Sequence, residues 1–307
     1  MNGIKIGIGF GHWQYGLPEP EALCTWAERA EAVGLDSIWL SDHIVTRNPN
    51  LDIACLFAMI AARTRRVKMG PSVLTLPARH PIQVAKTYAT LDYISRGRMI
   101  MAVGSGGDLR DLIACGVPVK ERGARLEEGI VILRKLWSES HVTHHGRFYS
   151  FEDVTIEPKP HDGPLDIWIG GKSDAILKRT ARLGDGWFPA LTSPEEFKRD
   201  MERLIAFGQE YGRTMNPREA GVLLFTYLTD DRERARQVMA PFVRALPMAP
   251  EEVEARFVVG TAAQCVEKIR RFVEAGCAKF VLRPSCPPAE VPAQIERYGR
   301  EILPRFC

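Results

Sequence analysis

The stretch 27-AERAEAVGLDSIWLSDH-43 decides the fold. It begins inside an amphipathic helix that we expect over residues 21–33, and Gly34 ends that helix because glycine readily adopts the left-handed conformation of a helix C-terminus. A short apolar strand, 37–40, comes next, and Asp42 and His43 follow it directly. A helix, a turn, a buried strand and polar residues at the strand's end are typical of α/β folds.

The same unit recurs along the whole chain. Short apolar runs predict strands, and segments with a helical period separate them. The expected strands are 4–10, 37–40, 67–74, 98–103, 166–169, 187–189, 221–228 and 278–282, and the expected helices are 21–33, 52–62, 82–94, 122–137, 174–183, 194–211, 262–275 and 290–302. Such alternation fits a doubly wound sheet or a closed barrel, and about eight strand–helix units favour a (β/α)8 TIM barrel.

One region interrupts this rhythm. Between about 138 and 163, the runs 141–143 and 147–150 predict two short strands around Gly146. We expect an insertion that decorates a single barrel domain spanning 1–307. The histidines of this region have no carboxylate or cysteine at ligand spacing, so no metal site is predicted. They are His141, His144 and His145.

Composition narrows the function classes. The 307 residues carry 41 Lys and Arg against 38 Asp and Glu, and no block of like charge indicates a nucleic-acid partner. The apolar runs fall far short of the ~20 residues that cross a bilayer, and the chain starts in a strand pattern, so neither a membrane segment nor a signal peptide is expected. The 7 cysteines stand singly, as reduced thiols do, and we expect a cytoplasmic protein.

Residues 7–12, GIGFGH, follow the first strand and nearly form a dinucleotide-binding fingerprint. His12 stands where the third glycine of GxGxxG belongs, and the prolines and glycine of 13–20 prevent a helix from opening there. A pyrophosphate site needs a helix N-terminus directly after the glycines. The sequence therefore argues against a Rossmann site.

Several segments in a fixed order resemble the luciferase-like flavin and deazaflavin oxidoreductases. They are Ala27–His43, Met69–Pro81, Ala89–Arg98, Ala102–Gly106, Glu121–Arg122, Gly170–Ser173, Gly184–Trp187 and Val259–Thr261. Each is weak alone, but the ordered set covers nearly the whole chain. The family fold is a TIM barrel with an insertion region, which agrees with the periodicity. The run 69–75 is most similar to the coenzyme F420-dependent branch, which includes methylenetetrahydromethanopterin reductases and F420-dependent glucose-6-phosphate dehydrogenases.

The resemblance implies a site at the carboxyl ends of the strands. In the F420 branch the bond that corresponds to Ser72–Val73 is a non-prolyl cis peptide that bulges against the back of the deazaflavin ring, and we expect the same here. Asp42 would contact the ring, and His43 would orient substrate or move a proton, because imidazole titrates near neutral pH. The alternative for this pair is a loop Asp that caps a turn beside a surface His.

Three further cofactor contacts follow from the same resemblance. Thr75 would meet the pyrimidine edge of the ring. Val103 and Gly104 would line the ring or its ribityl chain, since a glycine allows close approach. An ordinary strand and a tight turn are the alternatives.

The phosphate of the cofactor has its best candidate site at Gly170, Gly171 and Lys172. These residues follow a strand and precede the helix 174–183. Backbone N–H groups at a helix start attract anions, and the lysine adds a positive charge. A glycine turn with Ser173 as the N-cap would have the same sequence.

The substrate pocket is expected after the first two strands, where His12, Trp13 and Arg47 stand. Simple surface exposure is the alternative for each. Arg79 and Arg283 also follow strands. Arg79 is a candidate to meet an anionic tail or an acid, and Arg283 to contact a phosphate or a tail.

This chain departs from the glucose-6-phosphate enzymes at four positions. It has Gly107 where they carry a proton-donating Glu, and Arg47 where they carry a Trp. Ala190 and Ser193 replace their phosphate-holding Thr and Lys. Glucose 6-phosphate is therefore not the expected substrate.

The sequence thus predicts an F420-dependent oxidoreductase that transfers a hydride between the deazaflavin and a small organic substrate. An FMN-dependent luciferase-like monooxygenase is the alternative, because it shares the barrel and most of the motifs. A non-catalytic flavin-binding protein is the second alternative, and the intact Asp42–His43 pair argues against it. Family members are commonly dimers, so a homodimer is compatible with the chain.

Overall fold

The computed structural model describes residues 3–11, 13–45, 48–246 and 248–306. Its parallel strands form a ring of eight, one of them in two pieces. They are β1 (Lys5–Phe10), β2 (Ser37–Leu40), β3 (Lys68–Pro71) continued by β4 (Leu74–Thr75), β5 (Met101–Gly104), β8 (Ile167–Gly170), β9 (Gly186–Phe188), β10 (Gly221–Leu228) and β12 (Lys279–Pro284). These strands lie close to the ranges expected from the apolar runs.

Two sheets make up the ring. Their strand orders are β11-β10-β12-β1-β2-β3 and β4-β5-β8-β9. A parallel bridge between Met69 and Met99 closes one seam, and a bridge between Trp187 and Ala220 closes the other. The predicted TIM barrel is therefore confirmed, and β11 (Val258–Gly260) is an additional strand that pairs with the end of β10.

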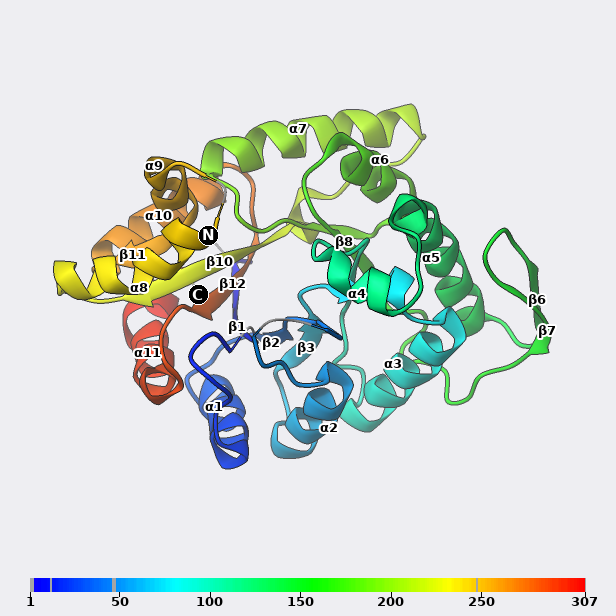
Figure 1. Cartoon of the computed structure of the whole chain (residues 1–307), viewed down its shortest axis with the longest axis horizontal. Helices are drawn as coiled ribbons and strands as arrows, with labels where there is room; N and C mark the ends of the chain where they lie inside the picture. Colours follow the sequence, from blue (N-terminus) through cyan, green and yellow to red (C-terminus); the bar gives the residue numbers. More distant parts are fainter. Residues whose placement is uncertain (1–2, 12, 46–47, 247, 307) are drawn as a thin grey trace.

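Helices cover the outside of the barrel (Figure 1). They are α1 (Pro20–Ala32), α2 (Ile53–Arg63), α3 (Pro81–Ser95), α5 (Arg122–Ser138), α6 (Asp174–Leu183), α7 (Pro194–Glu210), α10 (Ala262–Glu274) and α11 (Val291–Arg297). Short 3-10 turns lie at Leu76–Ala78, Val119–Glu121, Pro217–Glu219, Pro288–Glu290 and Leu303–Arg305, and a π-helical turn at Tyr298–Ile302. Gly34 follows α1 at a φ of 92°, as its predicted role requires.

Local sequence explains where several helices begin. Ser193 and Thr261 each form a capping box, with Glu196 and Gln264 respectively at the third helical position, and Asp52 accepts two backbone N–H groups at the start of α2. Such caps satisfy N–H groups that have no partner inside the helix. None of the described helices combines the length and the apolar character that a bilayer span requires.

Side chains alternate between the two faces of each strand. One buried cluster, built from single residues of different strands, fills the inside of the barrel, and a larger cluster lies between the strands and the helices. The inner cluster consists of Trp39, Ala102, Trp168, Phe188, Leu223 and Val281. It forms a packed floor beneath the carboxyl ends of the strands.

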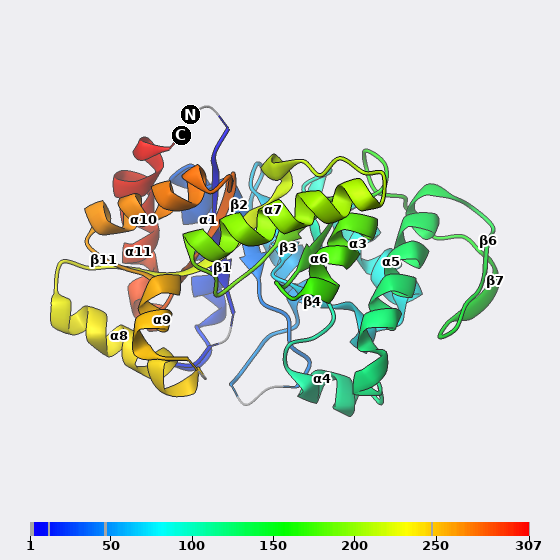
Figure 2. The same ribbon diagram turned by 90° about the horizontal axis from the view of Figure 1, so that it is seen from above.

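The two ends of the barrel differ in what covers them. In Figure 2 the chain termini lie at the side where β1 begins, and α4 (Leu109–Ala114), α8 (Arg232–Ala245) and α9 (Pro250–Arg256) lie toward the opposite side, where the strands end. The hairpin of β6 (Val142–His145) and β7 (Ser150–Val154) projects beside α5, away from the barrel axis (Figure 1). Glu128 of α5 accepts the backbone N–H groups of Phe148 and Tyr149, which attaches this hairpin to the barrel.

Candidate functional site

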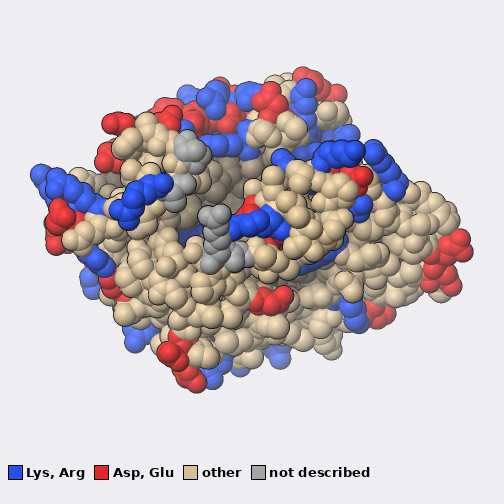
Figure 3. Space-filling view, in the orientation of Figure 1, with Lys and Arg blue, Asp and Glu red and all other residues tan. Residues whose placement is uncertain are grey.

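A cavity of about 450 Å³, here called the main cavity, opens at the carboxyl ends of β2, β4, β5, β8 and β9. Figure 3 shows this face of the molecule hollowed near its centre, with Lys and Arg side chains beside the hollow. Most of the predicted site residues belong to its wall. They are Asp42, His43, Ser72, Val73, Thr75, Gly104, Gly170, Gly171 and Lys172.

Two predicted residues are placed elsewhere. The assignment of Val103 to the cofactor site was wrong, because its side chain is fully buried in the cluster between β5 and the helices while Gly104 faces the cavity. Trp13 lines a separate cavity, described below. His12 and Arg47 lie outside the described residues.

The third barrel strand is interrupted at Ser72–Val73, where the peptide bond is cis, as expected. The Val73 side chain packs between two glycines: a Cβ added at Gly104 or Gly170 would lie 2.7 Å or 2.8 Å from its methyl groups. The buried Ser72 Oγ has no hydrogen-bond partner among the residues that the structure describes. The interruption therefore leaves an unsatisfied hydroxyl at the back of the main cavity.

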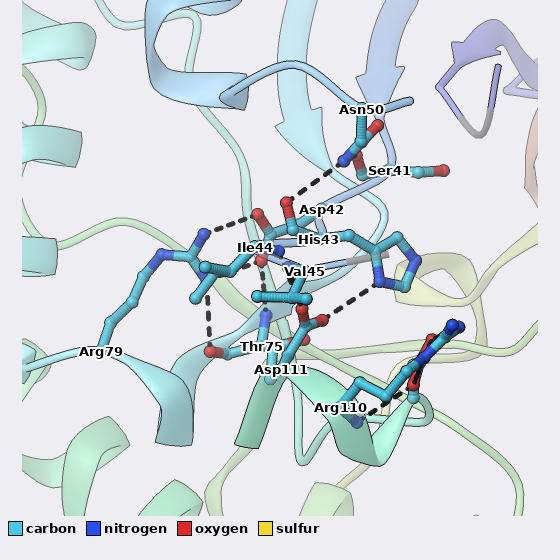
Figure 4. A network of polar contacts seen from close by, with 11 residues as sticks. Ser41, Asp42, His43, Ile44, Val45, Asn50, Thr75, Arg79, Arg110 and Asp111 are labelled. Atoms are coloured by element: carbon cyan, nitrogen blue, oxygen red, sulfur yellow. Dashed lines mark hydrogen bonds and ion pairs between the residues drawn. The ribbon is translucent and has the colours of Figure 1, made fainter. Parts of the chain in front are cut away.

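Asp42 organises the ends of β2 and β4. Its two carboxylate oxygens each lie 2.8 Å from a guanidinium nitrogen of Arg79, and Oδ2 also accepts the Thr75 backbone N–H at 3.0 Å (Figure 4). Burial raises the pKa of Asp42, and the Arg79 charge opposes this rise. Arg79 therefore meets an acid, one of the two roles that its position in the sequence allowed, and it fixes Asp42 beneath the cavity.

His43 is oriented by a residue of helix α4, which is distant in the sequence. Its Nδ1 lies 3.1 Å from Oδ2 of Asp111, and Oδ1 of Asp111 accepts the backbone N–H groups of Ile44 and Val45 (Figure 4). Asp111 is 1% exposed, in the first turn of α4. A carboxylate that receives these three contacts holds the loop after β2 and the imidazole in one arrangement.

The start of α4, which carries Asp111, is itself fixed by an ion pair at the rim of the main cavity. Arg110 hydrogen-bonds the carboxylate of Asp108, and this lowers the pKa of Asp108 to about 2. Asp108 also accepts the Arg110 backbone N–H as the N-cap of α4. Arg110 and the start of α4 therefore compensate the negative charge of Asp108.

The start of α6 forms the far wall of the main cavity. Gly171 has a φ of 118°, which favours glycine, and Ser173 at the N-cap position makes no side-chain hydrogen bond to the helix. Ser173 is thus the N-cap residue that the alternative expected, but its hydroxyl satisfies no backbone N–H group of the helix. Lys172 donates to the Leu191 carbonyl at 2.7 Å, so its ammonium group is held by the loop between β9 and α7.

A second cavity of about 310 Å³ adjoins the main one at the ends of β1, β10 and β12. Arg283 lines it and donates to Ser41 Oγ at 3.1 Å, and Ser41 belongs to the main cavity. Neither Ser41 nor Asp111 was predicted from the sequence as a site residue. Asp111 stands 68 residues from His43, and no local pattern connects them.

Comparison with known proteins agrees with this geometry. Residues 3–256 match the sequence profile of the luciferase-like monooxygenase family. The F420-dependent glucose-6-phosphate dehydrogenase of Amycolatopsis mediterranei is 28% identical over 336 aligned positions, which cover 99% of this chain and 98% of the relative. The enzyme of the same name from Beutenbergia cavernae is 30% identical over 94% of each chain.

Solved structures share the same fold over their full length. The monooxygenase RslO1 from Streptomyces bottropensis superposes with a TM-score of 0.88 at 24% identity, covering 99% of this chain and 100% of that one. An F420-dependent secondary alcohol dehydrogenase in complex with an F420-acetone adduct superposes with a TM-score of 0.87 at 21% identity, covering 99% of each. At these identities the likeness concerns the fold.

Proposed function

The chain belongs to the luciferase-like monooxygenase family, and from that premise we propose that it is a coenzyme F420-dependent oxidoreductase acting on a small organic substrate. Relatives that align over nearly their whole length are named for F420. The observation that carries the proposal is the wall of the main cavity, which brings together Ser72, Val73 and His43.

The residues present fit a flat ring system. The unpartnered Ser72 hydroxyl supplies a polar contact for a ring edge, and Gly104 and Gly170 give Val73 the room to form a solid back wall. A volume of about 450 Å³ falls within the range of ~300–1,000 Å³ of small-molecule sites. The N-terminus of α6, whose N-cap side chain makes no bond to it, would hold the phosphate.

When bound, the deazaflavin supplies or accepts the hydride. His43 handles the proton of the same reaction at Nε2, since Asp111 keeps the proton of the neutral ring on Nδ1. Asp42 and Arg79 fix the backbone at Thr75, so that the wall beneath the ring is rigid. The barrel thus positions the reacting groups and fixes the tautomer of the His43 ring.

Glucose 6-phosphate is not the substrate that we propose. Gly107 has no side chain to donate a proton, and Ala190 offers no hydrogen bond to a phosphate. Ser193 is used in the capping box of α7, where its hydroxyl accepts the Glu196 backbone N–H at 3.2 Å. These positions favour a substrate without a phosphate group.

Parallel calorimetric titrations with F420 and FMN test the proposal. We expect F420 to bind at least about tenfold more tightly than FMN, a difference of about 1.4 kcal/mol. Gly171→Ala should weaken F420 binding, because its φ of 118° is strained for alanine. Gly163→Ala is the matched control, since its φ is 100° and it does not line the main cavity. Tighter binding of FMN would favour the monooxygenase alternative and would sink the F420 assignment.

A further inference from the structure

Several aromatic side chains line the second cavity. Phe225 and Phe242 lie with ring centres 5.5 Å apart, and Phe10 and Trp13 both pack against Trp26. All but Trp26 belong to the lining of the cavity. Such walls favour a ligand whose frame is apolar.

Two polar atoms in this wall lack a partner. Trp13 Nε1 and Ser285 Oγ form no hydrogen bond to any described residue, although Trp13 is only 8% exposed and Ser285 only 3%. Leaving a buried polar group unpaired costs about 1–3 kcal/mol. The indole N–H can only donate, so the partner that it lacks is an acceptor.

Arg283 adds a positive charge to the same wall. It is 7% exposed, donates to Ser41 Oγ and to the Gly11 carbonyl, and stacks with its guanidinium carbon 5.1 Å from the centre of the Phe225 ring. Within the described part of the chain, no acid pairs with it and none lines the cavity. Burial lowers the pKa of Arg283 to about 10, so it stays charged at neutral pH.

A buried cation without a carboxylate partner is unusual, because buried charges are normally paired. Two of the five guanidinium N–H donors are used by Ser41 and Gly11. Ser285 follows Arg283 by two residues at the end of β12, and both line the cavity. The polar part of this wall therefore contains unsatisfied donors and an unpaired positive charge.

We propose that the second cavity binds the substrate and that the substrate is an organic carboxylate with an apolar frame, whose oxygens accept hydrogen bonds from Arg283, Ser285 and Trp13. The term substrate rests on the proposed function; the carboxylate site itself does not. Contact between Arg283 and Ser41 places this carboxylate at the boundary with the main cavity, so the apolar frame lies within reach of the cofactor site.

The test uses trans-cinnamate as the probe and cinnamamide as its uncharged match, titrated calorimetrically into the full chain. We expect cinnamate to bind about tenfold more tightly than cinnamamide. Ser285→Ala and Trp13→Phe should each weaken cinnamate binding several-fold. Ser285→Ala should leave the thermal midpoint nearly unchanged, because it removes no hydrogen bond within the described part of the protein. Arg283→Met should abolish the preference for cinnamate.

Tyr88→Phe is the matched control, since the Tyr88 hydroxyl is also buried and unpartnered among the described residues but lies outside the second cavity. Equal affinity for cinnamate and cinnamamide would overturn the inference, and so would unaltered cinnamate binding in both Ser285→Ala and Trp13→Phe. If Arg283→Met fails to fold, Ser285→Ala and Trp13→Phe decide whether the second cavity binds the carboxylate. An F420 titration on the same samples separates the two claims: cinnamate binding without F420 binding would refute only the proposed function.

Discussion

The His43 imidazole and the Asp111 carboxylate meet through Nδ1 and Oδ2 at 3.1 Å, although 68 residues separate them in the chain. The second carboxylate oxygen, Oδ1, is occupied by the N–H groups of Ile44 and Val45, at 2.9 Å and 2.7 Å. Because an ionised carboxylate only accepts, the neutral His43 ring carries its proton on Nδ1. The basic nitrogen is then Nε2.

Asp111→Asn should reverse this tautomer. The Asn carbonyl would remain at the two backbone N–H groups, so the amide NH2 would face Nδ1 of His43 and donate to it. The proton of the neutral ring would move to Nε2, and turnover should fall about 10–100-fold with little change in F420 affinity. Nitrogen NMR of the His43 ring checks the tautomer, which a merely structural defect would not invert. A variant with normal tautomer and normal pH profile would contradict this role for Asp111.

His43→Ala should lower turnover about 10²–10⁴-fold, the usual contribution of a positioned acid or base. The dissociation constant of F420 should change little, because Ser72, Gly104 and the start of α6 remain in place. Stopped-flow absorbance of the cofactor and a parallel titration measure the two quantities. His80→Ala is a suitable control, since His80 is exposed and does not line the main cavity. Unchanged turnover in His43→Ala would remove this residue from the reaction.

Arg79→Met should make stability strongly dependent on pH. Without the guanidinium, the buried Asp42 carboxylate has no counter-ion, so the pKa of Asp42, already raised by burial, rises further. Above the unfolded value of about 3.9 the folded variant then holds a proton that the unfolded chain releases, and stability falls as pH rises through the raised pKa. We expect the free energy of unfolding of Arg79→Met to be about 3–5 kcal/mol below that of the unchanged protein at neutral pH, and the difference to be smaller in mild acid.

Denaturant unfolding at about pH 5 and about pH 8, which bracket the usual stability maximum, measures this difference. The double variant Asp42→Asn with Arg79→Met is the control, because it removes the titrating group and should respond little to pH in this range. An equal loss of stability by Arg79→Met at both pH values would show that Asp42 is not its cause.

The order of strands and helices was predictable because each element carries its own local signal. Caps such as Ser193 and Thr261 mark helix starts, and glycine marks the end of α1. The face of each strand that lines the site was harder to predict from the sequence. All four residues of β5 are buried, so periodicity cannot tell Val103, which faces the helices, from Gly104, which faces the cavity.

Long side chains and partners that are distant in the sequence explain the other contacts of the site that could not be predicted. Lys172 precedes a helix start, as an anion site requires, yet its ammonium group reaches the Leu191 carbonyl on another loop. The partnership of Asp111 with His43 arises only when the barrel brings α4 beside the loop after β2. The cis bond at Ser72–Val73 was predicted through the family resemblance, since the residues around it have the pattern of an ordinary strand.

Packing at the back wall of the main cavity gives a last prediction. A Cβ at Gly104 would lie 2.7 Å from Val73 Cγ2, so Gly104→Ala should displace the Val73 side chain, lower stability by about 1–3 kcal/mol and weaken F420 binding. Val73→Ala in the same chain removes the methyl group that collides, so a double-mutant cycle should show favourable coupling between the two changes. Gly107→Ala, with nothing within 4 Å of its added Cβ, should leave stability unaffected. Denaturant unfolding of the four chains of the cycle measures the coupling, and strictly additive losses would mean that Val73 and Gly104 do not form this wall together.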